Sequence, residues 1–257
     1  MPIVENDGCK IFYELEGEGY PLFIHHGLGG SIKSWRDEGY IDPLTERYRL
    51  ILMHARGHGK SDRPYNPEAY SNKLMADDVV AVLDDLGIER AHFYGYSMGG
   101  RVGLALCKYA PSRFSSMIIG GMGVKERDVK SVDEMRSRVN LFRQGIDVVV
   151  SALEKERGRK LSDQELADWR SVDLKMFTAY ESLEDYIGFD EYLPLVDVPM
   201  LFYAGTSDRF YSYARQGAEM MSDARFVSIQ GLDHESGFNR SDLVLPHVLQ
   251  FLDEQDK

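Results

Sequence analysis

Short, uninterrupted apolar runs alternate along this chain with segments of helical periodicity. Apolar runs bounded by glycine are typical of strands buried on both faces, as in a parallel sheet. Two such runs occur at 22–24 and 50–53, and further strands are predicted at 91–94, 117–119, 199–204 and 225–229. Apolar residues spaced three and four apart predict helices over 71–86, 98–108 and 243–252. This alternation of strand and helix predicts an α/β fold built from right-handed βαβ units.

The first residues have the pattern of a β-hairpin. Two short runs, 3–4 and 10–15, flank the turn sequence Asn6-Asp7-Gly8. We therefore expect two antiparallel strands ahead of the parallel ones.

The segment 124–195 interrupts the alternation of strands and helices. It contains no strand-like run, and its helical patterns include 135–142, 148–153 and 161–180. Glycines precede the segment, and Pro194 and Pro199 mark its exit, as is common at boundaries. We expect a core domain formed by 1–123 and 196–257, with an inserted helical cap, or lid, at 124–195.

Composition argues against several classes of function. The chain has 30 Lys and Arg against 42 Asp and Glu, a net charge of −12, which disfavours binding to the phosphates of nucleic acid. No apolar stretch approaches the ~18 residues of a membrane span, and the first residues lack a signal-peptide pattern. Cys9 and Cys107 form neither a disulfide framework nor a metal-binding spacing. We expect a cytoplasmic protein without a nucleic-acid or membrane partner.

The sequence Gly95-Tyr96-Ser97-Met98-Gly99 follows a predicted strand and opens a predicted helix. A serine on so sharp a turn is crowded on both sides, so glycine is needed two residues before it and two after. The context favours a nucleophilic serine. The alternative is a glycine-rich helix start in which Ser97 is incidental.

A serine hydroxyl needs a base to activate it, and the base needs a third group to orient it. Asp208 and His234 each follow a predicted strand, at the end of the sheet where α/β proteins carry their sites. They complete the order Ser, Asp, His. Asp233 adjoins His234 and is the poorer candidate, because side chains that are neighbours in sequence rarely meet. No metal or organic cofactor is implied.

Hydrolysis of an ester also needs donors for the oxyanion. The backbone N–H of Met98 is one candidate, because it lies at the start of a helix. The glycine-rich turn His26-Gly27-Leu28-Gly29-Gly30 follows a strand and supplies a second, most simply the N–H of Leu28. The turn lacks the last glycine of a dinucleotide-binding loop.

These motifs, together with Arg56-Gly57-His58-Gly59-Lys60-Ser61, resemble the α/β-hydrolase fold family, in its serine esterase, lactonase and C–C hydrolase branch. The resemblance spans nearly the whole chain, except that the cap is recognisable only by position. It implies a mostly parallel eight-stranded sheet with a helical lid over the site. It also implies that Ser97 is the nucleophile, His234 the base and Asp208 the acid, with oxyanion donors at Leu28 and Met98.

Two positions depart from the pattern of the family. His54 stands where an Asp is usual before Arg56, in a loop that is generally structural. Tyr96 stands where C–C hydrolases of this branch usually have Asn. A serine nucleophile also disfavours haloalkane dehalogenase and epoxide hydrolase chemistry, which use Asp.

The expected reaction is hydrolysis of a small-molecule carboxylic ester through an acyl-enzyme. Three alternatives stay open: an acyl-homoserine or enol lactone as substrate, cleavage of a C–C bond, and a receptor that retains the triad. Trp35, Phe142 and Tyr180 are candidates for the substrate pocket, although helical spacing more often indicates core packing. Acyl length, stereochemistry, cap geometry and oligomeric state cannot be deduced from these patterns.

Overall fold

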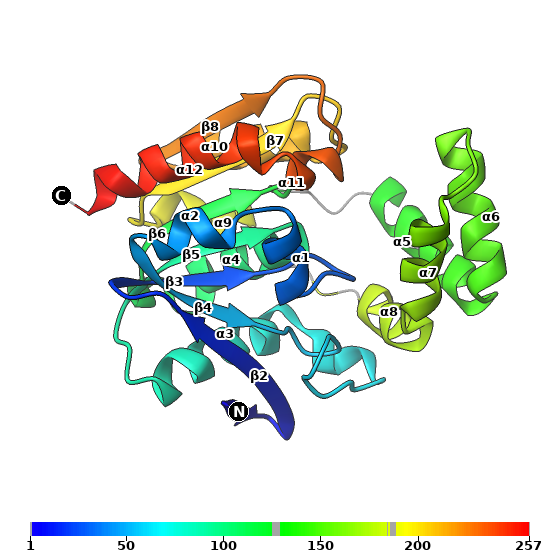
Figure 1. Cartoon of the computed structure of the whole chain (residues 1–257), viewed down its shortest axis with the longest axis horizontal. Helices are drawn as coiled ribbons and strands as arrows, with labels where there is room; N and C mark the ends of the chain where they lie inside the picture. Colours follow the sequence, from blue (N-terminus) through cyan, green and yellow to red (C-terminus); the bar gives the residue numbers. More distant parts are fainter. Residues whose placement is uncertain (1, 125–128, 184, 186–188, 257) are drawn as a thin grey trace. The chain divides into compact units, whose positions relative to one another are not determined.

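One eight-stranded sheet forms the centre of the larger part of the chain (Figure 1). The computed structural model describes residues 2–124, 129–183, 185 and 189–256. The strands are β1 (Ile3–Asn6), β2 (Cys9–Glu16), β3 (Tyr20–His25), β4 (Tyr48–Met53), β5 (Ala91–Tyr96), β6 (Phe114–Gly120), β7 (Met200–Gly205) and β8 (Ala224–Ile229). Their order across the sheet is β1-β2-β4-β3-β5-β6-β7-β8.

The sheet is parallel from β4 to β8, and β2 runs antiparallel to both β1 and β4. The first two strands form the expected hairpin, in which Asn6 pairs with Cys9. Asp7 and Gly8 both adopt positive φ, at 49° and 70°, as a two-residue hairpin turn of this hand requires. The predicted α/β fold with a mostly parallel eight-stranded sheet is confirmed.

Helices cover both faces of this sheet. The larger part of the chain contains α1 (Ile32–Asp37), α2 (Ile41–Thr45), α3 (Asn72–Asp85), α4 (Met98–Tyr109), α9 (Phe189–Tyr192), α10 (Tyr211–Glu219), α11 (Ser236–Asn239) and α12 (Ser241–Gln255). Short 3-10 turns, η2 (Pro111–Arg113) and η3 (Leu193–Leu195), precede β6 and β7. Across the described residues, no helix combines the length and the apolar character that a membrane crossing requires.

Alternate residues of the central strands face the two helical layers. Ile24 and Tyr94 belong to a buried apolar cluster with side chains from α1, α2 and α12, such as Phe251. Phe93 faces the other layer, where a Cβ at Gly103 of α4 would lie 2.7 Å from its ring. Helix α4 therefore packs directly on β5, and this close packing fixes the turn that joins them.

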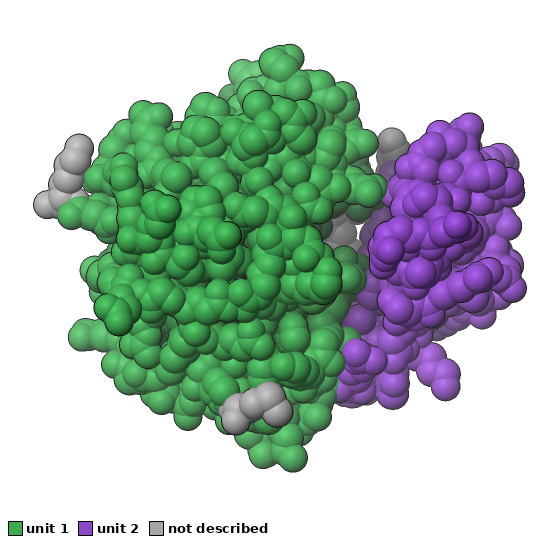
Figure 2. Space-filling model, viewed as in Figure 1, with its two compact units in different colours: residues 1–62, 72–125, 187–257 green, residues 63–71, 126–186 purple. Residues whose placement is uncertain are grey.

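The chain divides into two compact units, coloured separately in Figure 2. The larger unit comprises 1–62, 72–125 and 187–257, and the smaller comprises 63–71 and 126–186. The smaller unit contains η1 (Pro67–Tyr70), α5 (Val129–Arg143), α6 (Ile146–Arg157), α7 (Asp163–Ser171) and α8 (Leu174–Ser182).

These bounds differ at both ends from the expected insertion of 124–195. The C-terminal part of that segment belongs with the sheet, where the Tyr192 hydroxyl donates to the Leu104 carbonyl of α4 at 2.7 Å. Conversely, Tyr65 donates to Asp173 of the helical unit at 2.9 Å, so 63–71 belongs with the helices. The helix predicted over 161–180 is two helices, because the Asp173 side chain caps the start of α8.

Candidate active site

Ser97 lies on the sharp turn between β5 and α4. Its backbone has φ 54° and ψ −111°, a strained conformation for a residue with a side chain. The turn is tolerated because glycines flank it. A Cβ at Gly95 would overlap the Gly99 carbonyl, and a Cβ at Gly99 would overlap the His25 carbonyl. The Ser97 N–H donates to the Gly120 carbonyl at 2.9 Å, which holds the turn against β6.

The structure brings Ser97, His234 and Asp208 together in one hydrogen-bonded chain. Ser97 Oγ lies 2.9 Å from Nε2 of His234. On the other side of the ring, Nδ1 lies 2.9 Å from Oδ2 and 3.1 Å from Oδ1 of Asp208. All three residues follow the carboxyl ends of strands, β5, β8 and β7 respectively. This arrangement allows a proton to pass from the serine to the imidazole.

The loops that carry Asp208 and His234 are joined to each other by backbone hydrogen bonds. The Ser207 N–H donates to the Leu232 carbonyl, and the Gly231 N–H donates to Thr206 Oγ1, each at 2.9 Å. This pairing places Asp208 next to His234, although the two residues are 26 positions apart in sequence.

Asp208 and Asp233 both lie near His234, but they have different partners. The Asp208 side chain is fully buried and also accepts the Phe210 N–H at 2.9 Å. Asp233 instead accepts from Ser236, at 2.6 Å from its hydroxyl and 2.8 Å from its N–H. A buried carboxylate beside Nδ1 orients the ring and stabilises an imidazolium. Asp208 is in that place.

The turn after β3 lies directly beside the nucleophile. A Cβ at Gly27 would be 3.3 Å from the Ser97 Cβ. Two amides of the turn are already bonded: Gly29 N–H donates to His58 Nε2, and Gly30 N–H donates to the Gly27 carbonyl, both at 3.0 Å. Among the described residues, no acceptor is found for the Leu28 N–H. The amide of Met98 is at the first turn of α4, where no intrahelical acceptor is available.

Buried histidines hold this turn, and their partners dictate that they are neutral. Backbone N–H groups can only donate, so the Nε2 atoms of His26 and His58, which accept from Ala55 and Gly29, carry no proton. Their Nδ1–H groups donate to the carbonyls of Gly27 and Arg56. Burial is also the main reason that the pKa of His26 lies well below its usual value.

His54, which departs from the family pattern, is accommodated in the same way. Its Nδ1 accepts the Lys60 N–H at 3.0 Å, and its carbonyl accepts the Ser61 hydroxyl at 2.6 Å. Burial lowers its pKa. In this loop, His54 therefore stabilises the backbone as a neutral ring.

Arg56 of this loop forms a buried ion pair with Asp78 of α3. Both side chains are 1% exposed, and Arg56 donates from two nitrogens at 2.6 Å. Two adjacent acidic residues such as Asp77-Asp78 predict a solvated pair, and this prediction is wrong for Asp78. A carboxylate is tolerated here because a guanidinium from a distant turn neutralises it.

The residues predicted to contact substrate lie in two different places. Trp35 is 1% exposed and packs edge-on against Tyr40, Tyr94 and Phe238, so its ring is part of the core of the larger unit. Phe142 and Tyr180 belong to the helical unit, where they pack against Phe177 and Tyr70. Contact of any of these three with substrate stays a prediction.

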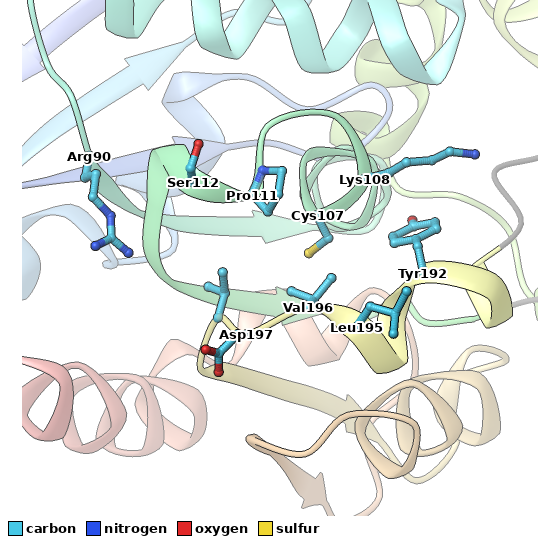
Figure 3. A pocket seen from close by; sticks show the side chains of 10 residues that line it. Arg90, Cys107, Lys108, Pro111, Ser112, Tyr192, Leu195, Val196 and Asp197 are labelled. Carbon is cyan, nitrogen blue, oxygen red and sulfur yellow. The ribbon is translucent and has the colours of Figure 1, made fainter.

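A cavity of about 400 Å³ lies at the amino ends of the parallel strands, opposite to the ends that carry Ser97, Asp208 and His234 (Figure 3). It is lined by Arg90, Cys107, Lys108, Pro111, Ser112, Tyr192 and 195–198. Several of these residues immediately precede β5, β6 or β7, whereas the triad follows the carboxyl ends of strands. The cavity is therefore separate from the candidate active site.

Two side chains that contribute to the site were not anticipated from the sequence. Tyr96 donates from its hydroxyl to the His234 carbonyl at 2.6 Å, and His58 accepts from Gly29. Both lie inside motifs that the sequence analysis singled out. Their contacts, however, join residues far apart in sequence, 138 residues for Tyr96–His234 and 29 for Gly29–His58, and no local pattern signals them.

Comparisons with known proteins agree with this architecture. A family model described as the alpha/beta hydrolase fold matches residues 20–241. The chain is 29% identical over 270 residues to a putative carbamate hydrolase, RutD, of Azorhizobium caulinodans, and the match covers 100% of both.

Two solved structures share the fold. A hydrolase from Pseudomonas aeruginosa PA01 has a TM-score of 0.83 and 23% identity, over 98% of this chain and 97% of that one. The enol-lactonase from Burkholderia xenovorans LB400 has a TM-score of 0.82 and 23% identity, over 98% and 100%. The family match, the sheet order and the serine turn lead to one conclusion: the chain belongs to the alpha/beta hydrolase fold family of hydrolases.

Proposed function

We propose that this protein hydrolyses carboxylic esters of small molecules through an acyl-enzyme on Ser97. The observation that supports the proposal is the continuous chain of hydrogen bonds from Ser97 Oγ through His234 to Asp208. A nucleophile, a base and an orienting acid in contact are the parts that acyl transfer requires.

In the first half of the reaction, Ser97 Oγ attacks the acyl carbon while its proton passes to Nε2 of His234. Asp208, bonded to Nδ1, stabilises the imidazolium. The amides of Leu28 and Met98 donate to the oxyanion. The C–O bond to the alcohol then breaks, and the alcohol leaves with the proton from His234.

In the second half, a water molecule gives a proton to His234 and attacks the acyl-enzyme. The resulting intermediate breaks down to the carboxylic acid, and the proton returns to Ser97 Oγ. Every proton transfer uses the one Nε2 atom, so a single well-oriented imidazole serves both halves. No other group is needed to balance the reaction.

Lactones and carbamates are the competing substrates. A lactone is an ester whose alcohol is tethered to the acid, and a relative by fold is named as an enol-lactonase. The full-length relative is named as a putative carbamate hydrolase. The same attack of Ser97 on a carbonyl carbon cleaves an ester, a lactone or a carbamate. Only kinetics therefore distinguishes these three classes of substrate.

The test is a substrate panel with Ser97→Ala as its reference. Nitrophenyl esters of increasing acyl length are compared with acyl-homoserine lactones, an enol lactone and an aryl carbamate by kcat/KM. We expect an ester to give the highest value and Ser97→Ala to lose about 10⁴-fold or more. Ser112→Ala, at the far edge of the sheet, is the matched control and keeps full activity.

A lactone or a carbamate at the head of the panel would overturn the substrate assignment while leaving the nucleophile intact. Activity retained by Ser97→Ala would overturn the nucleophile itself. Binding of a ligand with less than one turnover would favour the receptor alternative.

A further inference from the structure

Tyr96, the residue before the proposed nucleophile, contacts the loop that carries the proposed base. It is the last residue of β5 and is 5% exposed. Its hydroxyl donates to the main-chain carbonyl of His234 at 2.6 Å, and its ring centre lies 5.4 Å from the imidazole. A single side chain thus joins the strand that ends at Ser97 to the backbone of His234.

The residues packed around Tyr96 hold its phenol ring in a single position. Its ring lies 6.0 Å from the ring of Tyr203 and 5.1 Å from that of Phe238. A Cβ at Gly121 or at Gly237 would lie 2.7 Å or 2.9 Å from the hydroxyl oxygen. Both positions are glycine, and this leaves just enough room for the hydroxyl between them.

The hydroxyl is also a permanent donor. Burial, followed by the negative charge of Asp208, raises the pKa of Tyr96 well above its usual value. The phenol therefore keeps its proton wherever the enzyme is folded and active, and the bond to the His234 carbonyl does not titrate with the reaction.

The loop of His234 is fastened on its other side by the bonds of Leu232 and Gly231 to the acid loop. These bonds fix His234 relative to Asp208. The Tyr96 bond joins different parts, because it fixes the backbone of His234 relative to the strand that ends at the nucleophile. Proton transfer depends on that second relation, and a displacement of about 1 Å costs up to about 100-fold in rate.

We propose that Tyr96 is a positioning residue, whose hydroxyl holds the backbone of His234 where Nε2 can accept the Ser97 proton. The inference rests on the proposed function of the triad.

The first test is Tyr96→Phe, which removes the hydroxyl and keeps the ring. With a nitrophenyl ester, kcat is expected to fall about 10- to 100-fold while KM stays within about 2-fold, because proton transfer is impaired and binding is not. The downfield NMR signal of the His234 Nδ1 proton is expected to shift or broaden. A purely structural role would lower the melting temperature and leave this signal in place.

Tyr94→Phe is the matched control. It deletes another buried phenol hydroxyl of the same strand, bonded to the Tyr203 hydroxyl at 2.8 Å and not to the base loop. Its kcat is expected to stay within about 2-fold of the wild type. Equal kcat values for Tyr96→Phe and Tyr94→Phe would overturn the inference.

A second variant tests the same bond without deleting the hydroxyl. Gly237→Ala introduces a methyl group against the Tyr96 oxygen and should displace it, so kcat falls while KM is kept. The double variant with Tyr96→Phe should be no slower than the slower single variant, because both act through one contact. Additive losses would contradict the assignment, even if Tyr96→Phe alone folded poorly.

Labelling with a fluorophosphonate separates this inference from the proposed function. If the wild type neither labels at Ser97 nor turns over an ester, the proposed function fails. If the wild type does both and Tyr96→Phe labels at the wild-type rate, the positioning role fails. The expected result is complete labelling of both proteins, slower in the variant.

Discussion

Asp78 on α3 accepts two 2.6 Å hydrogen bonds from Arg56 and thereby anchors the turn that carries His58. Both side chains are almost completely buried, so neither charge has access to water when its partner is removed. The pair joins the helix layer to the loop that supports the glycine-rich turn beside Ser97. We therefore expect this ion pair to govern stability more than activity.

Asp78→Ala is expected to lower the free energy of unfolding by about 3–5 kcal/mol, because it removes the buried carboxylate that is hydrogen-bonded to the Arg56 guanidinium. Asp77→Ala is the control. Its carboxylate pairs with exposed Lys73 at 2.6 Å, and its loss should change the free energy of unfolding by less than about 1 kcal/mol. Urea denaturation measures both, and similar losses for the two variants would refute the anchoring role.

His58→Ala is expected to lower kcat about 10-fold, because Gly29 loses its acceptor and the turn that contains the Leu28 amide is held less firmly. His58→Gln, whose amide oxygen can accept the same N–H, should recover part of the loss. His247→Ala, on the exposed face of α12, serves as the control. Steady-state kinetics with a nitrophenyl ester makes the comparison. An unchanged kcat in His58→Ala would remove His58 from the support of the site.

Stability is expected to fall as the solution is made acidic, because buried histidines must be protonated. Burial lowers the pKa of His25 from 6.5 to about 4. Between these values the unfolded chain binds more protons than the folded one, so the free energy of unfolding decreases as pH falls. Stability from this residue is complete above pH 6.5, and about 3 kcal/mol is lost by the time pH reaches the folded pKa.

Urea denaturation across this interval measures the effect. His25→Asn should have a shallower dependence on pH than the wild type, whereas exposed His247→Asn should follow the wild type. A free energy of unfolding that stays constant from about pH 6.5 to about pH 5 would show that the buried rings are not protonated on unfolding.

Asp208→Asn is expected to lower kcat by about 10³- to 10⁴-fold, because an amide at this position no longer stabilises the imidazolium or selects its tautomer. Asp233→Asn is the matched variant, since Asp233 adjoins the same histidine but bonds to Ser236. Its kcat should change by less than about 10-fold. If Asp233→Asn were the slower enzyme, the acid would have to be reassigned.

Much of the fold was predictable because strands buried on both faces are apolar without interruption. The runs at 22–24 and 50–53 lie within β3 and β4, where every residue of both runs is buried. Helices α1 and α10 were not predicted, since they are short and carry few apolar residues. Trp35 in α1 reaches the core by packing on Tyr94 and Phe238, contacts that depend on the complete fold.

The proposed triad residues could be picked out because each follows a strand, and the carboxyl ends of parallel strands lie at the same end of a sheet. The side chains that support them were not. Asp78 has the local signature of a solvated acid, and its burial is made tolerable by Arg56, 22 residues away, together with a hydrogen bond from the Asn6 side chain. The extra residues 63–71 of the helical unit likewise join it through a distant partner, Asp173.

The most direct test of the central claim is to find where the acyl group is carried during turnover. Wild type and Ser97→Ala are mixed with a nitrophenyl ester, quenched in acid within one turnover, digested and analysed by mass spectrometry. We predict one acyl group on the peptide that contains Ser97 in the wild type, and none on any peptide of the variant. An acyl group on another residue, or steady ester turnover by Ser97→Ala, would contradict the account.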